Sequence, residues 1–293
     1  MIAANEAVAR YLIARRVPAV FRYHADPDQH HVERLYAQLA ALEVATPALP
    51  EGHLGPAERR DAVRRAGVAV GTHLDAARAR GEGDGSALWV LVLRALKQAF
   101  YSAESCTHSG LASPAYLHFT SPIRRYPDLL VHRALTGALG IDAAVPTGPE
   151  LELAAAESSE TERAATDLER KADRICAALL LEQELGASGW TTPLDAEVTG
   201  LIATGAFLRF GAAYEGFLPL RPQAGGELTL DDAEVGLIDP NGRHAVRLGD
   251  RLEVRVAEID PLRGRVRLER ADRRLAPREE RTRAHRRMAR RPR

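Results

Sequence analysis

The stretch HFTSPIRRYPDLLVHRAL, residues 118–135, is the most informative part of the sequence. Its Thr120-Ser121-Pro122 is typical of a helix start, with a capping hydroxyl followed by a proline in the first turn. The leucines of its second half form an apolar stripe at helical spacing. The stretch therefore predicts a helix that begins near residue 120 and packs one face against a core.

Three side chains would lie in the turns nearest the start of that helix: Arg124, Arg125 and Tyr126. Free backbone N–H groups and the positive end of the helix dipole favour an anion there, and two guanidinium groups would strengthen the site. Phosphate is the natural ligand of such a site. The same residues also fit a capped surface helix whose arginines are solvated or pair with Asp128.

Composition bounds the class of protein. With 293 residues and 45% hydrophobic side chains, the chain can bury the core of one large or two ordinary domains. Cys106 and Cys176 belong to no disulfide or zinc pattern, which favours a reducing compartment. No segment approaches the roughly 18 apolar residues of a membrane span, and the N-terminus lacks the apolar core of a signal peptide. We expect a cytoplasmic protein with no membrane partner.

The charge is unevenly distributed. Lysine and arginine number 40, as do aspartate and glutamate. Residues 271–293, however, contain ten arginines and only three acidic side chains. This basic end is expected to be disordered or a frayed helix, and it would add salt-sensitive affinity for phosphates unless it is simply a solvated tail.

Hydrophobic periodicity divides the chain into a helical part and a β part. Apolar residues at helical spacing predict helices over 2–16, 28–43, 86–102 and about 150–184. Gly186, Gly189 and Pro193 then end the helical pattern. Five short alternating segments follow, separated by turn residues, and predict a small antiparallel barrel: 194–202, 206–211, 214–220, 251–260 and 264–270.

The signature HFTSPIRRYPDLLVHR resembles that of the RNB catalytic domain of the ribonuclease II/R family. Its members are 3′→5′ exoribonucleases that degrade single-stranded RNA to nucleoside monophosphates. MIAANEAVA (1–9), FRYHADP (21–27) and LRALKQAFYSAE (93–104) resemble other family segments in the same order, and the β region resembles the S1 RNA-binding barrel. The resemblance implies an α+β chain with three parts: the mainly helical C-terminal half of an RNB domain (1–190), a five-stranded S1/OB-type antiparallel barrel (191–271) and a basic tail (272–293).

The resemblance also suggests which residues act. It implies that Arg124 contacts the scissile phosphate and that a glutamate of the following long helix lies close to it. Glu162 and Glu169 are both candidates, since a spacing of seven places them on one helix face, and Glu169 is slightly preferred. For either, a solubilising ion pair is the alternative. Arg125, Tyr126 and His118 are expected to contact RNA, with a structural role as the alternative for each.

In the barrel, aromatic side chains on the outer face would stack on bases without reading the sequence. Strand alternation places Phe207 and Arg209 on one face and Leu208 and Phe210 on the other. Phe207 and Arg209 are therefore expected to bind RNA. Phe210 and Phe217 are expected to lie in the core.

The family's catalytic Mg²⁺ is held by aspartates of a DP…D.DDA-type motif, and nothing in this sequence matches that motif. No metal ligand is therefore assigned here. We expect a C-terminal fragment, a split or misannotated reading frame or a degenerate copy. This leaves three hypotheses: an exoribonuclease lacking its metal-binding half, an inactive single-stranded RNA-binding protein, or one part of a split enzyme whose aspartates come from a separate N-terminal polypeptide.

Overall fold

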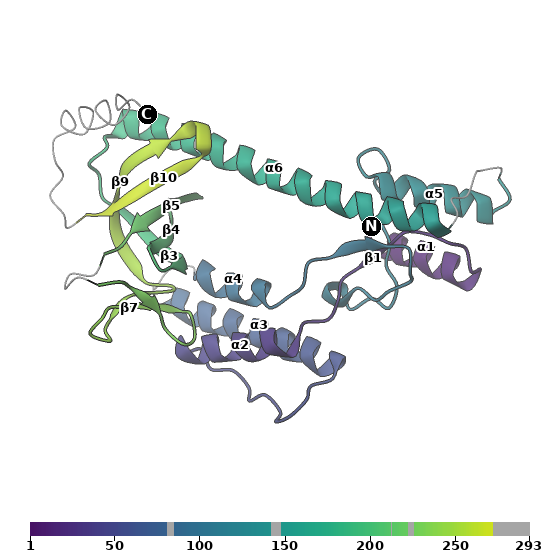
Figure 1. The fold of residues 1–293 in the computed structure, drawn as a ribbon, viewed down its shortest axis with the longest axis horizontal. Helices are drawn as coiled ribbons and strands as arrows, with labels where there is room; N and C mark the ends of the chain where they lie inside the picture. Colours follow the sequence, from purple (N-terminus) through teal and green to yellow (C-terminus); the bar gives the residue numbers. More distant parts are fainter. Residues whose placement is uncertain (81–84, 142–147, 212, 222–225, 272–293) are drawn as a thin grey trace. The chain divides into compact units, whose positions relative to one another are not determined.

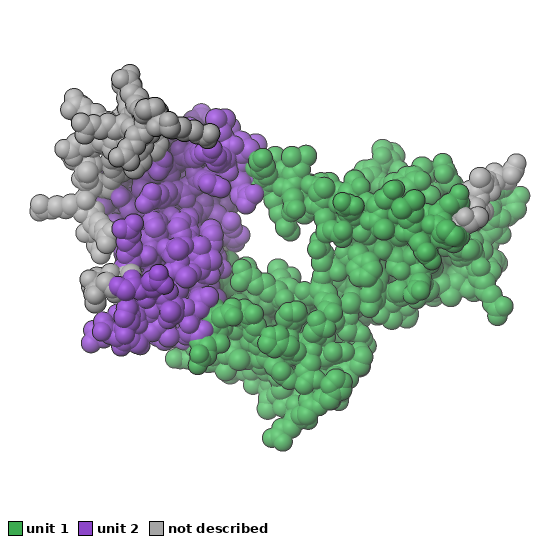
Figure 2. Space-filling view, in the orientation of Figure 1, with its two compact units in different colours: residues 1–172, 232–235 green, residues 173–231, 236–293 purple. Residues whose placement is uncertain are grey.

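The structure is a computed structural model that describes residues 1–80, 85–141, 148–211, 213–221 and 226–271. The chain divides into two compact units, drawn in different colours in Figure 2: residues 1–172 with 232–235, and residues 173–231 with 236–293. The basic tail expected at 272–293 lies outside the described residues. Within the described residues, no helix is long and apolar enough to cross a membrane.

The first unit consists mainly of helices with one small sheet (Figure 1). Its helices are α1 (Ile2–Ala14), α2 (Gln29–Ala41), α3 (Pro56–Ala79), α4 (Ser86–Arg94), α5 (Tyr126–Ala138) and the first part of α6 (Gly148–Ser188). Two short strands, β1 (Phe21–Tyr23) and β2 (Phe100–Ser102), pair antiparallel, and a short 3₁₀ turn, η1, covers Ser109–Leu111. The predicted helices 2–16 and 28–43 are thus confirmed as α1 and α2, which are two and three residues shorter than expected.

Two apolar clusters hold the small sheet in place. In the first, Leu12 of α1 and Val131 of α5 pack with Phe21 of β1 and Leu117. In the second, Tyr101 of β2 packs with residues of α5 and of the first turns of α6. Because α1, α5 and α6 all contribute to these clusters, the β1–β2 pair is fixed between helices that are distant in the sequence.

Helix α3 is absent from the predicted elements. Pro56 occupies its first turn, and the Glu58 carboxylate accepts a hydrogen bond from the backbone N–H of Gly55 at 2.7 Å. Its buried side chains Val63, Val70 and Leu74 are separated by alanines and arginines, so the apolar stripe is weak in the sequence. Figure 1 shows α3 beside α2 and α4, which it contacts.

The predicted helix 86–102 is wrong in its second half. Helix α4 ends at Arg94, and the chain then enters strand β2. Tyr101 pairs with Arg22 of β1, and its backbone N–H donates to Ser159 Oγ at 2.9 Å. Pairing with β1 and burial of the Tyr101 ring therefore override the local helical preference of this segment.

The predicted helix start at Thr120-Ser121-Pro122 is also wrong, since α5 begins at Tyr126 with Pro127 in its first turn. Residues 121–125 form a turn in which Ser121 O accepts from the backbone N–H groups of Arg124 and Arg125. The hydroxyl of Thr120 is buried without a hydrogen-bond partner in the structure, so it caps no helix. The proline that opens the helix is the one after the arginines.

The long predicted helix is confirmed and runs from Gly148 to Ser188 as α6. The second unit begins within it. There, Gly264 has φ +59°, and a Cβ at this position would lie 2.7 Å from the backbone carbon of Arg174. Only glycine permits this turn to approach the helix backbone so closely.

The second unit contains a closed barrel of five strands in the order β10-β5-β4-β3-β9. These strands are β3 (Leu194–Ile202), β4 (Gly205–Phe210), β5 (Tyr214–Pro219), β9 (Arg251–Asp260) and β10 (Arg265–Arg270). The five predicted segments are confirmed. The barrel is not wholly antiparallel, however, because β10 pairs with β5 in parallel and so closes the barrel. The α+β class therefore stands, with a mixed barrel.

A small three-stranded antiparallel sheet was not expected from the sequence. It contains β6 (Thr229–Leu230), β7 (Gly236–Ile238) and β8 (His244–Arg247), and a 3₁₀ turn, η2 (Pro261–Arg263), precedes β10. The strands are too short to produce a readable alternation, which explains their absence from the prediction.

Candidate functional site

A group of polar and aromatic side chains gathers in the first unit around the ring of Tyr101. We call it the Tyr101 cluster; its members are Arg22, Tyr101, His118, Arg125, Asp128 and Glu162. They come from β1, β2, the signature segment and α6, so residues up to 140 positions apart meet here. Three of the six, His118, Arg125 and Glu162, are site residues expected from the sequence.

Arg22 links two members of the cluster. Its Nη1 lies 2.5 Å from Glu162 Oε2, and its guanidinium carbon lies 4.6 Å from the centroid of the Tyr101 ring. The Arg22 side chain is only 13% exposed. Since a buried cation needs a charged or π-electron partner, the carboxylate and the ring together explain why arginine is stable on this strand.

Tyr101 in turn contacts the signature segment. Its hydroxyl oxygen lies 2.9 Å from His118 Nδ1, and the two rings meet edge to face with centroids 5.6 Å apart. Burial raises the pKa of Tyr101 to about 12. The hydroxyl therefore keeps its proton at any physiological pH.

His118 is a neutral side chain in this environment. Burial is the main cause that lowers its pKa to about 4, and the positive charges of Arg125 and Arg22 act in the same direction. His108 behaves similarly, with a pKa lowered to about 4 by burial and by neighbouring His24 and Arg22. Neither imidazole supplies a positive charge for a phosphate at neutral pH.

Asp128 organises the turn of the signature. Its side chain is fully buried, and Oδ1 accepts hydrogen bonds from the backbone N–H of Ser121 at 2.7 Å and from Arg125 Nη2 at 2.9 Å. Arg125 Nε also lies 2.8 Å from Oδ2. The predicted alternative in which an arginine pairs with Asp128 is thus observed for Arg125. An external anion at this helix start would compete with a carboxylate already present.

Arg124 and Tyr126 flank this pair and are exposed. The structure shows no hydrogen bond or ion pair of the Arg124 guanidinium with another described residue. Tyr126, the first residue of α5, is 54% exposed. These two side chains are therefore accessible to a ligand, whereas Arg125 is committed to Asp128.

The two candidate glutamates differ in their surroundings. Glu162 is half-buried and pairs with Arg22 of the cluster. Glu169 is exposed, two helical turns further along α6, and no contact brings it to the signature. The structure therefore brings Glu162, and not the slightly preferred Glu169, together with the other expected residues.

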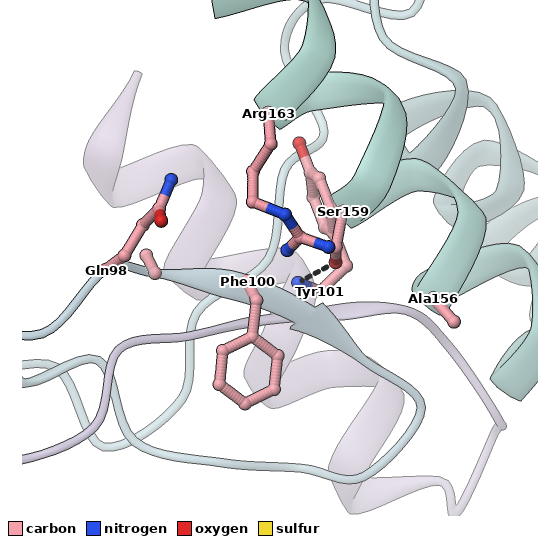
Figure 3. Close-up of a pocket in the computed structure, with 7 residues that line it drawn as sticks. Gln98, Phe100, Tyr101, Ala156, Ser159 and Arg163 are labelled. Atoms are coloured by element: carbon pink, nitrogen blue, oxygen red, sulfur yellow. Dashed lines mark hydrogen bonds between the residues drawn. The ribbon is translucent and has the colours of Figure 1, made fainter.

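A hollow of about 400 Å³ lies on the side of β2 next to α6 (Figure 3). Its lining includes Phe100, Tyr101, Ser159 and Arg163. Ser159 connects the hollow to the Tyr101 cluster. Its hydroxyl accepts a hydrogen bond from the backbone N–H of Tyr101, which Figure 3 draws as a dashed line, and donates one to Ala155 O. Arg163 follows Glu162 in the chain and contributes the cationic side chain of this lining.

A second candidate surface lies on the outer face of the barrel. Along β4, Phe207 and Arg209 are exposed, while Leu208 and Phe210 are buried, so the predicted alternation is confirmed. Phe217 of β5, however, is not in the core. It lies opposite Phe207 in the strand pairing, is half-buried, and its ring centroid lies 5.2 Å from that of Phe207.

Phe217 was misplaced because Gly216 and Leu218 occupy the inward positions of β5. Gly216 is tightly packed, since a Cβ there would lie 2.8 Å from Leu268. Arg209 on the same outer face approaches Glu215 at 3.9 Å, and exposed Arg267 of β10 lies beside Phe217 in the strand register. The surface thus combines a pair of aromatic rings with two guanidinium groups.

Comparisons with known proteins agree with this architecture. Residues 1–141 match the model of the RNB domain family. Ribonuclease R of Aquifex aeolicus is 31% identical over 280 residues, which cover 92% of this chain and 36% of that protein. The chain belongs to the ribonuclease II/R family.

Solved structures of this family superpose on the chain. The apo form of Mycoplasma genitalium RNase R matches with a TM-score of 0.74 and 25% identity, over 92% of this chain and 40% of that one. The same protein in complex with ribose methylated single-stranded RNA matches with a TM-score of 0.72 and 24% identity, over the same shares. The chain spans about a third of the length of the curated relatives it matches.

The described residues of this RNB family chain do not fit the Mg²⁺ that the family implies. In the described ranges, no group of three or more histidine, cysteine, aspartate or glutamate side chains is arranged to hold a metal ion. Of the two carboxylates in the Tyr101 cluster, Glu162 is paired with Arg22, and Asp128 is buried beneath Arg125 and Ser121. Neither is arranged as part of a carboxylate-rich magnesium site.

Sequence reasoning missed three members of the Tyr101 cluster. Arg22 and Tyr101 lie in the family-like segments 21–27 and 93–104, where only the resemblance pointed to them. Asp128 was considered only as a possible partner of surface arginines. The available signal for Arg22 was a charged residue within an otherwise apolar run, VFRY, and such a residue needs a specific partner if it is buried.

Proposed function

We propose that the chain supplies the phosphate-binding part of the active site and the RNA-binding barrel of a ribonuclease II/R-type 3′→5′ exoribonuclease. Such an enzyme hydrolyses single-stranded RNA to nucleoside monophosphates. The observation that carries the proposal is the Tyr101 cluster, which assembles around the RNB signature in a chain of this family. Membership of a family whose relatives are named ribonuclease R supports the choice of reaction.

Within this proposal, residues 1–190 are the RNB portion and 191–271 the S1-like barrel. Arg124 holds the scissile phosphate, because it is the exposed arginine of the signature turn, and a guanidinium can stabilise the negative charge that develops on the phosphoryl oxygens. Arg125 shapes that turn through Asp128. Glu162 is assigned to the active site in preference to Glu169, because Arg22 fixes its position.

The proposal includes Mg²⁺ only because the family implies this ion. Its acidic ligands are assigned to a separate N-terminal RNB polypeptide, and the residues of this chain bind and orient the RNA end. Carboxylates and water are the ligands that Mg²⁺ prefers, whereas the signature of this chain presents the exposed guanidinium of Arg124 to phosphate. The two sets of residues are chemically complementary.

The barrel is proposed to bind single-stranded RNA through Phe207 and Phe217. Two neighbouring exposed rings can stack on successive bases, while Arg209 and Arg267 contact phosphates. The solved relative in complex with ribose methylated single-stranded RNA supports this ligand class. The tail after residue 271 adds sequence-independent phosphate affinity in this proposal.

The Phe207→Ala substitution is expected to weaken RNA binding by about 5- to 150-fold, because each stacked base contributes about 1–3 kcal/mol. The measurement is fluorescence anisotropy of a 5′-labelled oligo(A) in buffer containing EDTA. Leu262→Ala is the matched control, since it also removes an exposed apolar side chain of the second unit. Equal affinities of the Phe207→Ala variant and the wild type would exclude stacking on this face.

The function is tested by incubating the purified chain with 5′-labelled poly(A) and Mg²⁺, alone and with a polypeptide that carries the family's aspartate motif. Release of nucleoside monophosphates only by the mixture supports the split-enzyme form of the proposal. Degradation by the chain alone would contradict the assignment of the metal ligands to a second polypeptide. RNA binding without degradation in either case would identify a non-catalytic RNA-binding protein.

A further inference from the structure

The hydrogen bond between Tyr101 and His118 determines which nitrogen of the imidazole carries the proton. Tyr101 is 5% exposed, and His118 Nδ1, 2.9 Å away, is the hydrogen-bond partner of its hydroxyl in the described structure. If Nδ1 carried the proton and donated it, the buried hydroxyl hydrogen would lack an acceptor. Tyr101 therefore donates, Nδ1 accepts, and the proton of the neutral imidazole resides on Nε2.

The charges around His118 keep the ring neutral. Arg22 of β1 and Arg125 of the signature turn oppose a positive charge on the imidazole, and burial opposes it further. Asp128 favours a positive charge, but its carboxylate is occupied by Arg125 and Ser121. Tyr101, Tyr116 and the neutral His108 complete the ring's surroundings. Above a pKa of about 4, the imidazole presents a neutral N–H.

The free edge of this ring lies at the surface of the cluster. His118 is only partly buried, and in the described part of the chain no hydrogen bond is made by Nε2. The signature turn with Arg124 follows six residues later, and Arg125 is close enough to affect the charge of the ring. A neutral donor can bind a backbone oxygen here without adding a third cation beside Arg22 and Arg125.

We propose that Tyr101 is a positioning residue that holds His118 as the neutral Nε2–H tautomer, and that this N–H donates to an oxygen of the RNA backbone. The inference rests on the proposed function for its ligand. It gives His118 the role of a hydrogen-bond donor to RNA and not of a proton-transferring or cationic group.

The tautomer is tested on the full chain without RNA, by two-bond ¹H–¹⁵N correlation NMR of the histidine rings. The His118 signals are assigned by their loss in the His118→Gln variant. We expect the neutral Nε2–H pattern from pH 5.5 to 8, and a mixture of both neutral tautomers in Tyr101→Phe, which keeps the ring beneath Arg22. A cationic ring, or an Nδ1–H tautomer in the wild type at pH 7, would overturn the proposal.

The contact to RNA is tested by the affinity of each variant for 5′-labelled oligo(A) in EDTA buffer between pH 6 and 8. His118→Ala and Tyr101→Phe are expected to bind about 3- to 10-fold more weakly, by a factor that does not change with pH. His118→Gln should bind like the wild type, because its amide nitrogen replaces the Nε2–H donor. His53→Ala, at an exposed loop position, is the matched control.

The outcomes separate the two proposals. If the wild type binds RNA, and His118→Ala and Tyr101→Phe both bind it with the affinity of the wild type, the inference is wrong and the proposed function stands. If His118→Gln loses as much affinity as His118→Ala, the side chain acts through packing and not through its N–H. If the wild type does not bind RNA, the proposed function fails, and the assigned contact fails with it.

Discussion

Replacement of Asp128 with alanine is expected to lower the free energy of unfolding by about 3–5 kcal/mol, because removal of one member of a buried ion pair leaves the other charge uncompensated. Asp128 is fully buried, and it satisfies both the Arg125 guanidinium and the backbone N–H of Ser121. Both donors would lose their acceptor in the variant. We expect the signature turn to lose its fixed conformation before the rest of the first unit unfolds.

The loss is measured by urea denaturation and by hydrogen exchange of the α5 amides. Asp128→Asn should lower the free energy of unfolding by less, because the amide oxygen can still accept a hydrogen bond from the Ser121 N–H. Asp167→Ala is the matched control: Asp167 also pairs with an arginine three residues away, but at 4.0 Å and with an 80% exposed side chain. An exposed pair of this kind contributes about 0–1 kcal/mol. A similar loss of unfolding free energy in the Asp128→Ala and Asp167→Ala variants would show that burial of the Asp128–Arg125 pair does not increase its contribution to stability.

Replacement of Arg124 with alanine is expected to reduce the turnover of RNA by about 100- to 1,000-fold while leaving its dissociation constant nearly unchanged. Removal of one preorganised group that stabilises developing negative charge has an effect of this size. Arg124 is suited to the role because it is exposed and lies in a turn fixed by Asp128. Binding should persist, because the barrel and the tail provide most of the RNA contacts in the proposed function.

The measurement compares single-turnover rates and dissociation constants in the preparation that degrades 5′-labelled poly(A). Arg133→Ala is the matched control, since Arg133 is another exposed arginine and lies on α5. Arg124→Lys should recover only part of the rate, because an ammonium group lacks the two-pronged geometry of guanidinium. Equal losses of binding and rate in Arg124→Ala would make this residue an ordinary contact to the RNA backbone.

Several parts of the fold could be predicted because the relevant forces are local. Helices α1, α2 and α6 show apolar residues at helical spacing, and the five barrel strands show alternation between turn residues. The alternation of β4 correctly placed Phe207 outside and Phe210 inside. In these elements, local pattern and tertiary packing favour the same conformation.

The errors occur where a partner outside the segment overrides its local preference. Residues 100–102 have a helical pattern, but they become a strand because Arg22 of β1 provides a pairing partner and Ser159 of α6 accepts the Tyr101 N–H. The residues Thr120-Ser121-Pro122 resemble a helix start, yet α5 begins at Tyr126, because Asp128 draws the Ser121 N–H into a turn. None of these three partners lies within the segment whose local preference it overrides.

The sequence by itself determined the family signature, the order of helical and β parts, and most of the residues considered for RNA contact. Only the tertiary structure decided how they are combined. In the structure, Glu162 forms an ion pair with Arg22, and the Tyr101 hydroxyl lies within hydrogen-bond distance of His118. Arg125 pairs with Asp128, whereas Arg124 is exposed. Spacing along the chain specifies which face of an element a side chain occupies. The partner of a buried charge or hydroxyl depends on elements brought together from elsewhere in the sequence.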